Sequence, residues 1–193
     1  MTRQNVRQAE HDRQSGFTLI EVVISIVILM VGLLSVLAVF GVAMANTQTV
    51  QMDQIARQKT MEAVESVYTA RQTQQLTFAQ IANTPTGIFK TGFQDVLSAG
   101  PDGLVGTADD GTGPNPGCPG TYQCVVLPGV DGKMGDAVTY ELKNFKRQIQ
   151  IANVNNPDGT PNLNLKQIIA TVQYSNGRTQ KTYQVQGLIS SFR

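Results

Sequence analysis

Gly16-Phe17-Thr18-Leu19-Ile20-Glu21 leads directly into residues 22–45, a run of 24 residues without one charged side chain. About 20 apolar residues suffice for a helix to cross the hydrocarbon core of a bilayer, so the run predicts a membrane-spanning helix. The Glu21 carboxylate lies at the start of that helix, where a charge is costly unless an opposite charge pairs with it. The stretch therefore predicts a long first helix and a charged partner for Glu21.

The residues before this stretch form a short polar segment. Residues 1–15 contain no apolar run that could join a core, which is typical of a processing or orienting segment. Their arginines outnumber their acids, which favours a cytoplasmic position for this end of the chain. The charged side chains are Arg3, Arg7, Glu10, Asp12 and Arg13.

Two simple interpretations of the apolar run leave something unexplained. A removable secretory signal would account for the small residues of Ala43-Met44-Ala45. The apolar part of a secretory signal, however, is only about 7 to 15 residues long, and the apolar run of this chain is longer. A plain single-pass anchor accounts for the length of the run but does not account for Glu21.

Gly16 followed by Phe-Thr-Leu-Ile-Glu resembles the prepilin processing motif of type IV pilins and type II secretion pseudopilins. The resemblance implies that residues 1–16 are a leader peptide, that prepilin peptidase cuts after Gly16, and that Phe17 becomes an N-methylated terminus. It also implies that Glu21 pairs with the terminal amine of a neighbouring subunit in a fibre. The implied partners are the peptidase, other pilin or pseudopilin subunits, and an inner-membrane assembly platform.

The resemblance extends to location and subtype. It implies a bacterial inner-membrane protein that spans the membrane once at residues 17–45, with a periplasmic C-terminal domain, and that later enters a pilus or pseudopilus. Residues 22–34, a run of isoleucine and leucine that meets Gly-Leu-Leu, are similar to the same region of the PilV group of minor pilins and of I-type minor pseudopilins. The C-terminal residues 166–191 are also similar to those of the PilV group. Ala38 stands where a major pilin often has proline, which favours a minor subunit.

The composition favours an exported structural protein over an enzyme. Removing residues 1–16 leaves twelve basic and twelve acidic side chains and no histidine, because the single histidine is His11. The remaining chain lacks the usual parts of a Ser-His-Asp site, a Cys-His site or a zinc cage. Because this remaining chain has no net charge, its composition does not indicate a basic surface for nucleic acid. We therefore expect no catalysis and no required cofactor.

The helical pattern continues beyond the apolar run. Apolar residues with helical spacing, and the absence of proline before Pro85, predict one helix from Phe17 to about Gln75. Residues 46–75 would be its amphipathic continuation, packed on a globular domain. The apolar stripe consists of Met52, Ile55, Ala56, Ala63, Val64, Val67 and Tyr68, with Lys59 and Thr60 interrupting it.

The C-terminal region, residues 76–193, predicts one globular β domain. Alternating and β-branched residues indicate strands at 138–142, 148–151, 166–174 and 179–188, and Asn176-Gly177 predicts a hairpin between the last two. The fold class is therefore α+β, a type IV pilin-like arrangement of one long helix on an antiparallel sheet. In the third of these strands we expect the core to be formed by Ile168, Ala170, Val172 and Tyr174.

The domain contains a long loop region, residues 98–136, whose glycine, proline and acid content at 100–120 disfavours regular structure. Glycine-rich turns could bring Asp102, Asp109 and Asp110 together to bind calcium, which prefers several oxygen ligands. The resemblance to the pilin and pseudopilin family adds support, because the major pseudopilins of that family hold calcium in a loop beside the sheet. The pattern is not that of an EF-hand, and a solvated acidic turn is the alternative. A shorter echo at residues 129–136 could add ligands or form a β-turn.

The two cysteines of the chain, Cys118 and Cys124, lie close together in this loop. Their spacing fits neither a CxxC redox pair nor a zinc site. In the oxidising compartment that export implies, we expect them to form one local disulfide, with two free thiols as the alternative.

Two other functions could use the same scaffold. A DNA-uptake adhesin would need a basic patch, and the local cations are Lys143, Lys146, Arg147 and Lys166. Four cations near a sheet are more often a solvated face, so nucleic acid is not an expected partner. A membrane-anchored calcium-binding protein without a filament role would show calcium-dependent stability and no cleavage after Gly16.

Overall fold

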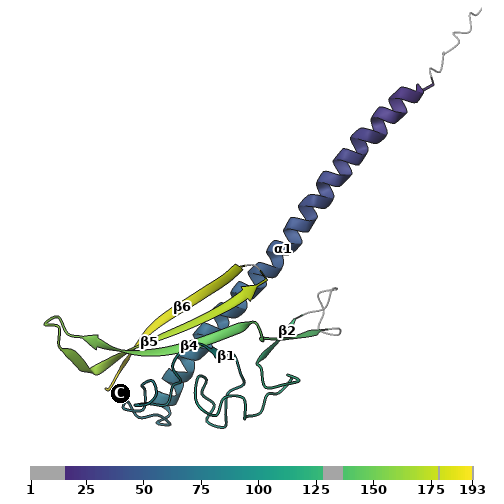
Figure 1. Ribbon diagram of the computed structural model, residues 1–193. Coiled ribbons are helices and arrows are strands. Elements are labelled where there is room, and N and C mark those ends of the chain that lie inside the picture. The colour runs from purple at the N-terminus through teal and green to yellow at the C-terminus, as the bar shows by residue number, and fades with distance from the viewer. Residues whose placement is uncertain (1–15, 128–136, 178, 193) are drawn as a thin grey trace, which may run out of the picture. The chain divides into compact units, whose positions relative to one another are not determined.

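The computed structural model describes residues 16–127, 137–177 and 179–192, and it confirms the α+β class. The helix is α1, Leu19–Gln72. The strands are β1, Gln94–Asp95; β2, Cys124–Leu127; β3, Val138–Glu141; β4, Phe145–Asn155; β5, Pro161–Asn176; and β6, Thr179–Ser190 (Figure 1). The chain divides into two compact units, Met1–Thr47 and Gln48–Arg193, which are described in turn.

The first unit contains the apolar part of α1. The helix begins at Leu19, two residues later than predicted, because Thr18 acts as its N-cap: the Thr18 Oγ1 accepts a hydrogen bond from the Glu21 backbone N–H at 3.3 Å. The side chains of residues 19–44 are exposed, and α1 is long and apolar enough to cross a membrane. Burial of a large aliphatic side chain contributes about 1.5 to 3 kcal/mol, so this surface favours cover by lipid or by other protein.

In the second unit, residues 48–72 of α1 pack on one face of the sheet through the predicted apolar stripe. The prediction that Thr60 interrupts the stripe is wrong, because its hydroxyl donates to the Ala56 carbonyl oxygen at 2.7 Å and is satisfied inside the helix. Met52 and Tyr68 pack at the edges of the core. The buried residues of α1 are Ile55, Ala56, Thr60, Ala63, Val64, Val67 and Ala70.

The helix ends at Gln72, three residues before the predicted end. Gln74 has a left-handed φ of 64°, which is the usual kind of conformation that terminates a helix. The Leu76 N–H then donates to the Ala70 carbonyl oxygen at 3.0 Å, and the buried Leu76 side chain joins the core. The end of α1 thus coincides with the burial of Leu76 in the core, which the local composition does not indicate.

The main sheet has the order β1-β4-β5-β6 with antiparallel pairing (Figure 1). The predicted hairpin is confirmed: β5 and β6 pair continuously from Leu165 opposite Ser190 to Asn176 opposite Thr179. Gly177 follows with a φ of 65°, a left-handed conformation that glycine adopts without steric cost. The predicted core residues of β5, at positions 168, 170, 172 and 174, are all buried.

Two short strands and one loop differ from the sequence expectations. β1 was not predicted, and neither was β2, which pairs with β3 in a separate two-stranded sheet. Residues 100–120 contain no helix or strand, as predicted, yet the loop is not wholly solvated. Leu104 and Val105 are each 2% exposed and pack with Phe89 and Ile149 in the core. The loop therefore supplies part of the core as well as surface.

Asp53 joins the second unit's helix to the β5–β6 hairpin. It accepts a hydrogen bond from the buried Tyr174 hydroxyl at 2.6 Å and another from the Lys181 ammonium at 3.0 Å. The Tyr174 hydroxyl, together with Lys181, lowers the pKa of Asp53. Since the folded pKa lies below the unfolded value of about 3.9, this contribution to stability is present above that value and is lost as pH falls through the folded pKa.

We expect Asp53→Asn to lower the free energy of unfolding by about 1 kcal/mol at neutral pH, a modest value because the carboxylate is partly solvated. The difference in unfolding free energy between variant and wild type should shrink as the pH falls below about 4 and should close once the pH is below the lowered folded pKa, where Asp53 is protonated in both states. Denaturant unfolding of the full chain in detergent measures the gap at both pH values. The exposed Glu65→Gln is the matched control, and a gap that does not depend on pH would contradict the ionic role.

Candidate processing and assembly site

Gly16 and Phe17 lie before the first turn of α1 and belong to no helix or strand. Among the described residues, a Cβ placed on Gly16 would meet no atom within 4 Å. Phe17 is 83% exposed. The bond between the two residues is therefore open to a processing enzyme on the side that the structure describes.

Glu21 lies in the first turn of α1, three residues after the Thr18 cap. An acid there interacts favourably with the helix dipole. Its backbone N–H is bound by Thr18, but no other described residue of the chain gives its carboxylate a hydrogen bond or an ion pair. At the centre of a bilayer an unpaired acid costs about 2.5 to 3.5 kcal/mol. The described residues therefore supply no opposite charge to the Glu21 carboxylate.

Asp102 and Asp109, two of the predicted calcium ligands, accept hydrogen bonds within their own loop. Asp102 Oδ1 accepts from the Leu104 N–H at 2.8 Å, and Asp109 Oδ1 accepts from the Thr107 hydroxyl at 2.6 Å, which lowers the pKa of Asp109. Among the described residues, no group of three or more His, Cys, Asp or Glu side chains is placed to hold a metal ion. Calcium binding stays a prediction from the sequence, and the echo at residues 129–136 lies outside the described residues.

Asp110, the third predicted ligand, lies beside the buried Arg147 in a cluster of charged side chains. Its Oδ2 accepts from the Gly106 N–H at 2.8 Å and lies 4.0 Å from the Nη2 atom of Arg147. Burial raises the pKa of Asp110, while the Gly106 N–H and the Arg147 guanidinium act in the opposite direction. On the other side, Arg147 Nη1 lies 3.8 Å from Oε1 of Glu62 on α1. We name these three residues the Glu62–Arg147–Asp110 cluster.

This cluster was not found from the sequence, where Arg147 counted only as one of four cations. The Arg147 side chain is 2% exposed, and its burial lowers the pKa of the guanidinium, whereas Glu62 and Asp110 raise it. Gln123 Nε2 also donates to Glu62 Oε1 at 3.0 Å. Alternation at residues 145–150 of β4 places Arg147 on the same face as the buried Phe145 and Ile149, and this alternation was the signal that could have shown Arg147 to be buried. The cluster links α1, β4 and the acidic loop.

The four cations of the predicted basic region do not form one patch. Arg147 is buried and faces α1, whereas its neighbour Lys146 is exposed on the opposite face of the strand. The three lysines have partners within the chain: Glu141 at 2.6 Å for Lys143, Asp95 at 2.8 Å for Lys146, and the Phe78 and Ile81 carbonyl oxygens at 2.9 and 2.7 Å for Lys166. This arrangement gives no support to a DNA-binding surface.

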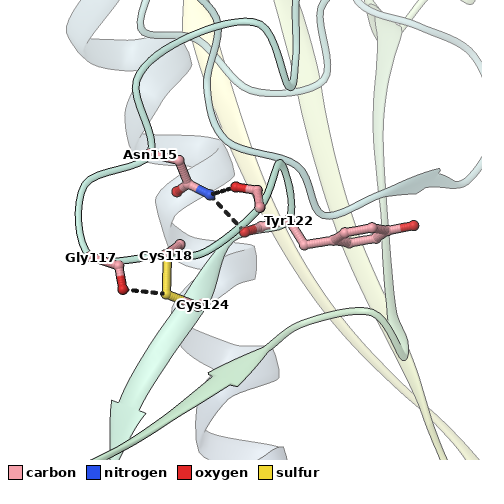
Figure 2. The surroundings of a disulfide bond; sticks show 6 residues. Asn115, Gly117, Cys118, Tyr122 and Cys124 are labelled. Atoms are coloured by element: carbon pink, nitrogen blue, oxygen red, sulfur yellow. Dashed lines mark hydrogen bonds between the residues drawn. A yellow bond between two sulfur atoms is a disulfide. The ribbon is translucent and has the colours of Figure 1, made fainter.

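Cys118 and Cys124 form the local disulfide that the sequence predicts, with their Cα atoms 5.6 Å apart. Figure 2 shows the bond beside Asn115, whose Nδ2 donates to the carbonyl oxygens of Gly120 and Tyr122 at 2.6 and 2.8 Å. The disulfide and this amide therefore hold the same small loop just before β2. Because the closed loop is short, the bond constrains the unfolded chain less than a long-range disulfide would.

Comparison with known proteins identifies the motif at the start of the chain. A family model of the prokaryotic N-terminal methylation motif matches residues 11–37. No curated protein and no solved structure matches the chain. The matched residues include the exposed Phe17, the first part of the exposed apolar helix, and Glu21, whose carboxylate has no partner in the part of the chain that the structure describes. Residues 11–37 therefore form an N-terminal methylation motif, which is typical of the type IV pilin family.

Proposed function

We propose that the protein is a minor subunit of a type IV pilus or of a type II secretion pseudopilus, and that its function is assembly. The observation that carries the proposal is the methylation motif at residues 11–37 on a helix whose apolar side chains are exposed from residue 19 to residue 44. Such a surface needs cover by lipid before assembly and by neighbouring helices afterwards. The PilV-like sequence pattern of residues 22–34 and the alanine at position 38 favour a minor subunit.

Processing is the first step of the proposed mechanism. In the inner membrane, with the C-terminal domain in the periplasm, prepilin peptidase cleaves after Gly16. The new amine of Phe17 is then methylated, and it keeps its positive charge. Cleavage removes the polar leader, so the helix begins almost directly with apolar residues and can leave the bilayer for a fibre.

Charge pairing is the second step. The Phe17 amine of one subunit meets the Glu21 carboxylate of a neighbour in a layer of low dielectric constant. Lipid and a fibre core both cover the apolar surface, so the ordinary aqueous hydrophobic effect does not drive the transfer between them. An unpaired charge is costly both in the bilayer and in the fibre core. The ion pair can therefore select the axial position at which the incoming subunit docks. The proposed role of the protein requires no catalytic residue and no cofactor.

Mass analysis of the N-terminus of the protein from its native membrane tests the proposal. We expect a terminus at methylated Phe17. Gly16→Leu should leave the leader attached to nearly all molecules, because the cleavage site needs a small side chain, whereas Gly16→Ala should be cut more readily. Gly32→Leu is the matched control: it adds the same side chain to the apolar helix at a glycine with open space around it, and it should be processed normally.

Other termini would overturn the proposal in distinct ways. A terminus at Asn46 would show that the apolar run is a removed secretory signal, and a terminus at Met1 would show a plain anchor. Efficient cleavage of the Gly16→Leu protein would contradict the steric requirement at that position.

A further inference from the structure

The face of the sheet that is turned away from α1 is rich in glutamine. Side chains alternate along each strand, so the residues between those that pack on α1 point to the opposite face. Strands β4, β5 and β6 lie side by side (Figure 1), and their pairing places these residues in four rows. The rows are Lys146, Gln173 and Thr182; Gln148, Thr171 and Gln184; Gln150, Ile169 and Gln186; and Ala152, Gln167 and Leu188. We name these residues the outer sheet face.

Most of the amides on the outer sheet face are free to bind a ligand. Gln167 Nε2 donates to Gln186 Oε1 across two strands at 2.9 Å. Within the part of the chain that the structure describes, no hydrogen bond involves the side chains of Gln148, Gln150, Gln173 and Gln184. A primary amide carries two N–H donors and one carbonyl acceptor. The face therefore presents uncommitted donors and acceptors next to one another.

The outer sheet face is almost free of charge. Its one charged residue, Lys146, lies at a corner and is paired with Asp95 at 2.8 Å. A neutral face does not attract the phosphates of nucleic acid, whose binding depends on cations. Its larger apolar members, Ile169 and Leu188, are too few to form the apolar core of a protein interface. The complementary ligand is an uncharged molecule that itself both donates and accepts hydrogen bonds, and hydroxyl groups have this property.

The spacing of the rows favours a polymer over a small sugar. Neighbouring strands lie about 4.8 Å apart, and alternate residues of one strand lie about 6.7 Å apart. The free amides thus form a shallow two-dimensional array. One solvent-exposed hydrogen bond contributes little by itself, but an extended chain with regularly spaced hydroxyl groups can meet several amides at once. We propose that the outer sheet face binds an extended, neutral polysaccharide. This inference concerns the second unit and does not depend on filament assembly.

The binding test uses the full chain in micelles of a detergent without a sugar headgroup, because a sugar headgroup would compete for the site. Microcrystalline cellulose is the probe, and the bound fraction is measured after sedimentation at low and at high salt. We expect the protein to be retained equally at both salt concentrations, since the face holds no free charge to be screened. Release of the protein by salt would overturn the proposal, because it would indicate ionic binding. No retention at either salt concentration would overturn it too.

A matched pair of variants assigns the binding to the outer sheet face. The triple variant Gln150→Ala, Gln173→Ala, Gln184→Ala should weaken retention roughly tenfold or more, because several hydrogen bonds are lost together. The control replaces three exposed glutamines of α1 with alanine, at positions 51, 54 and 58, and should bind like the wild type.

A melting curve of each variant checks the fold. Should the alanines destabilise the sheet, the triple variant Gln150→Glu, Gln173→Glu, Gln184→Glu tests the same point with side chains of equal length, since it removes two N–H donors at each position. Wild-type retention by the folded alanine variant, or by the folded glutamate variant where the alanine variant does not fold, would overturn the proposal.

Discussion

Glu21→Gln is expected to abolish incorporation of the subunit into filaments while cleavage after Gly16 continues. Glu21 carries the only charge from there to Met52, so no neighbouring side chain along the helix can replace it. Removing one member of a buried ion pair leaves the other charge uncompensated, which costs about 3 kcal/mol or more. Since about 1.4 kcal/mol corresponds to a factor of ten, incorporation should fall by about a hundredfold.

The choice of glutamine separates charge pairing from a local role of Glu21. Thr18 and Glu21 have the spacing of a capping box, in which either glutamate or glutamine at the third helical position can bind back to the cap. Glu21→Gln therefore keeps the capping capacity and removes only the charge. Immunoblots of sheared filaments and of the membrane fraction measure incorporation, with Glu65→Gln as the control. Normal incorporation of the Glu21→Gln protein would contradict the pairing role, whereas failure of Glu21→Ala alone would point to the cap.

Arg147→Met is expected to destabilise the second unit by about 3 kcal/mol. The substitution leaves Asp110, whose side chain is 4% exposed, without the Arg147 cation, whereas Glu62 keeps its ion pair with Lys59 at 2.6 Å. Within the described residues, the two terminal nitrogens of Arg147 have no hydrogen-bond partner, so its contribution is mainly electrostatic. Methionine fills much of the same volume, so the expected loss of stability reports the uncompensated Asp110 carboxylate more than a cavity.

Two further measurements test this explanation of the Arg147→Met effect. Adding Asp110→Asn should recover part of the loss, because the amide oxygen still accepts from the Gly106 N–H and the unpaired charge is gone. Lower pH should also reduce the loss. A raised folded pKa of Asp110 contributes stability below its unfolded value, and this stability disappears as pH rises through the folded pKa. Chemical unfolding of the full chain in detergent measures both effects. A loss that neither the second substitution nor acid reduces would indicate a packing role.

Local patterns predicted most of the regular structure. The spacing of Ile55, Ala63 and Val67 placed the second part of α1 on a core, and alternation in β5 predicted Ile168 and Ala170 as core residues, because a shift by one position would expose the whole set. Thr60 was misjudged because periodicity treats a hydroxyl as polar, although a bond to the preceding turn satisfies it. The burial of Leu104 and Val105 was not predictable from a loop composition that disfavours helix and strand.

The residues proposed for processing and assembly lie within six consecutive positions, from Gly16 to Glu21. A sequence motif can point to them, because their proposed chemistry depends on neighbours along the chain and on the apolar run that follows. The Glu62–Arg147–Asp110 cluster and the outer sheet face join residues that are far apart in the chain. Their existence depends on the docking of α1 and on the register of β4, β5 and β6, which arise from packing free energy across the whole domain. Short-range patterns carry the first kind of information, and only the folded arrangement of side chains carries the second.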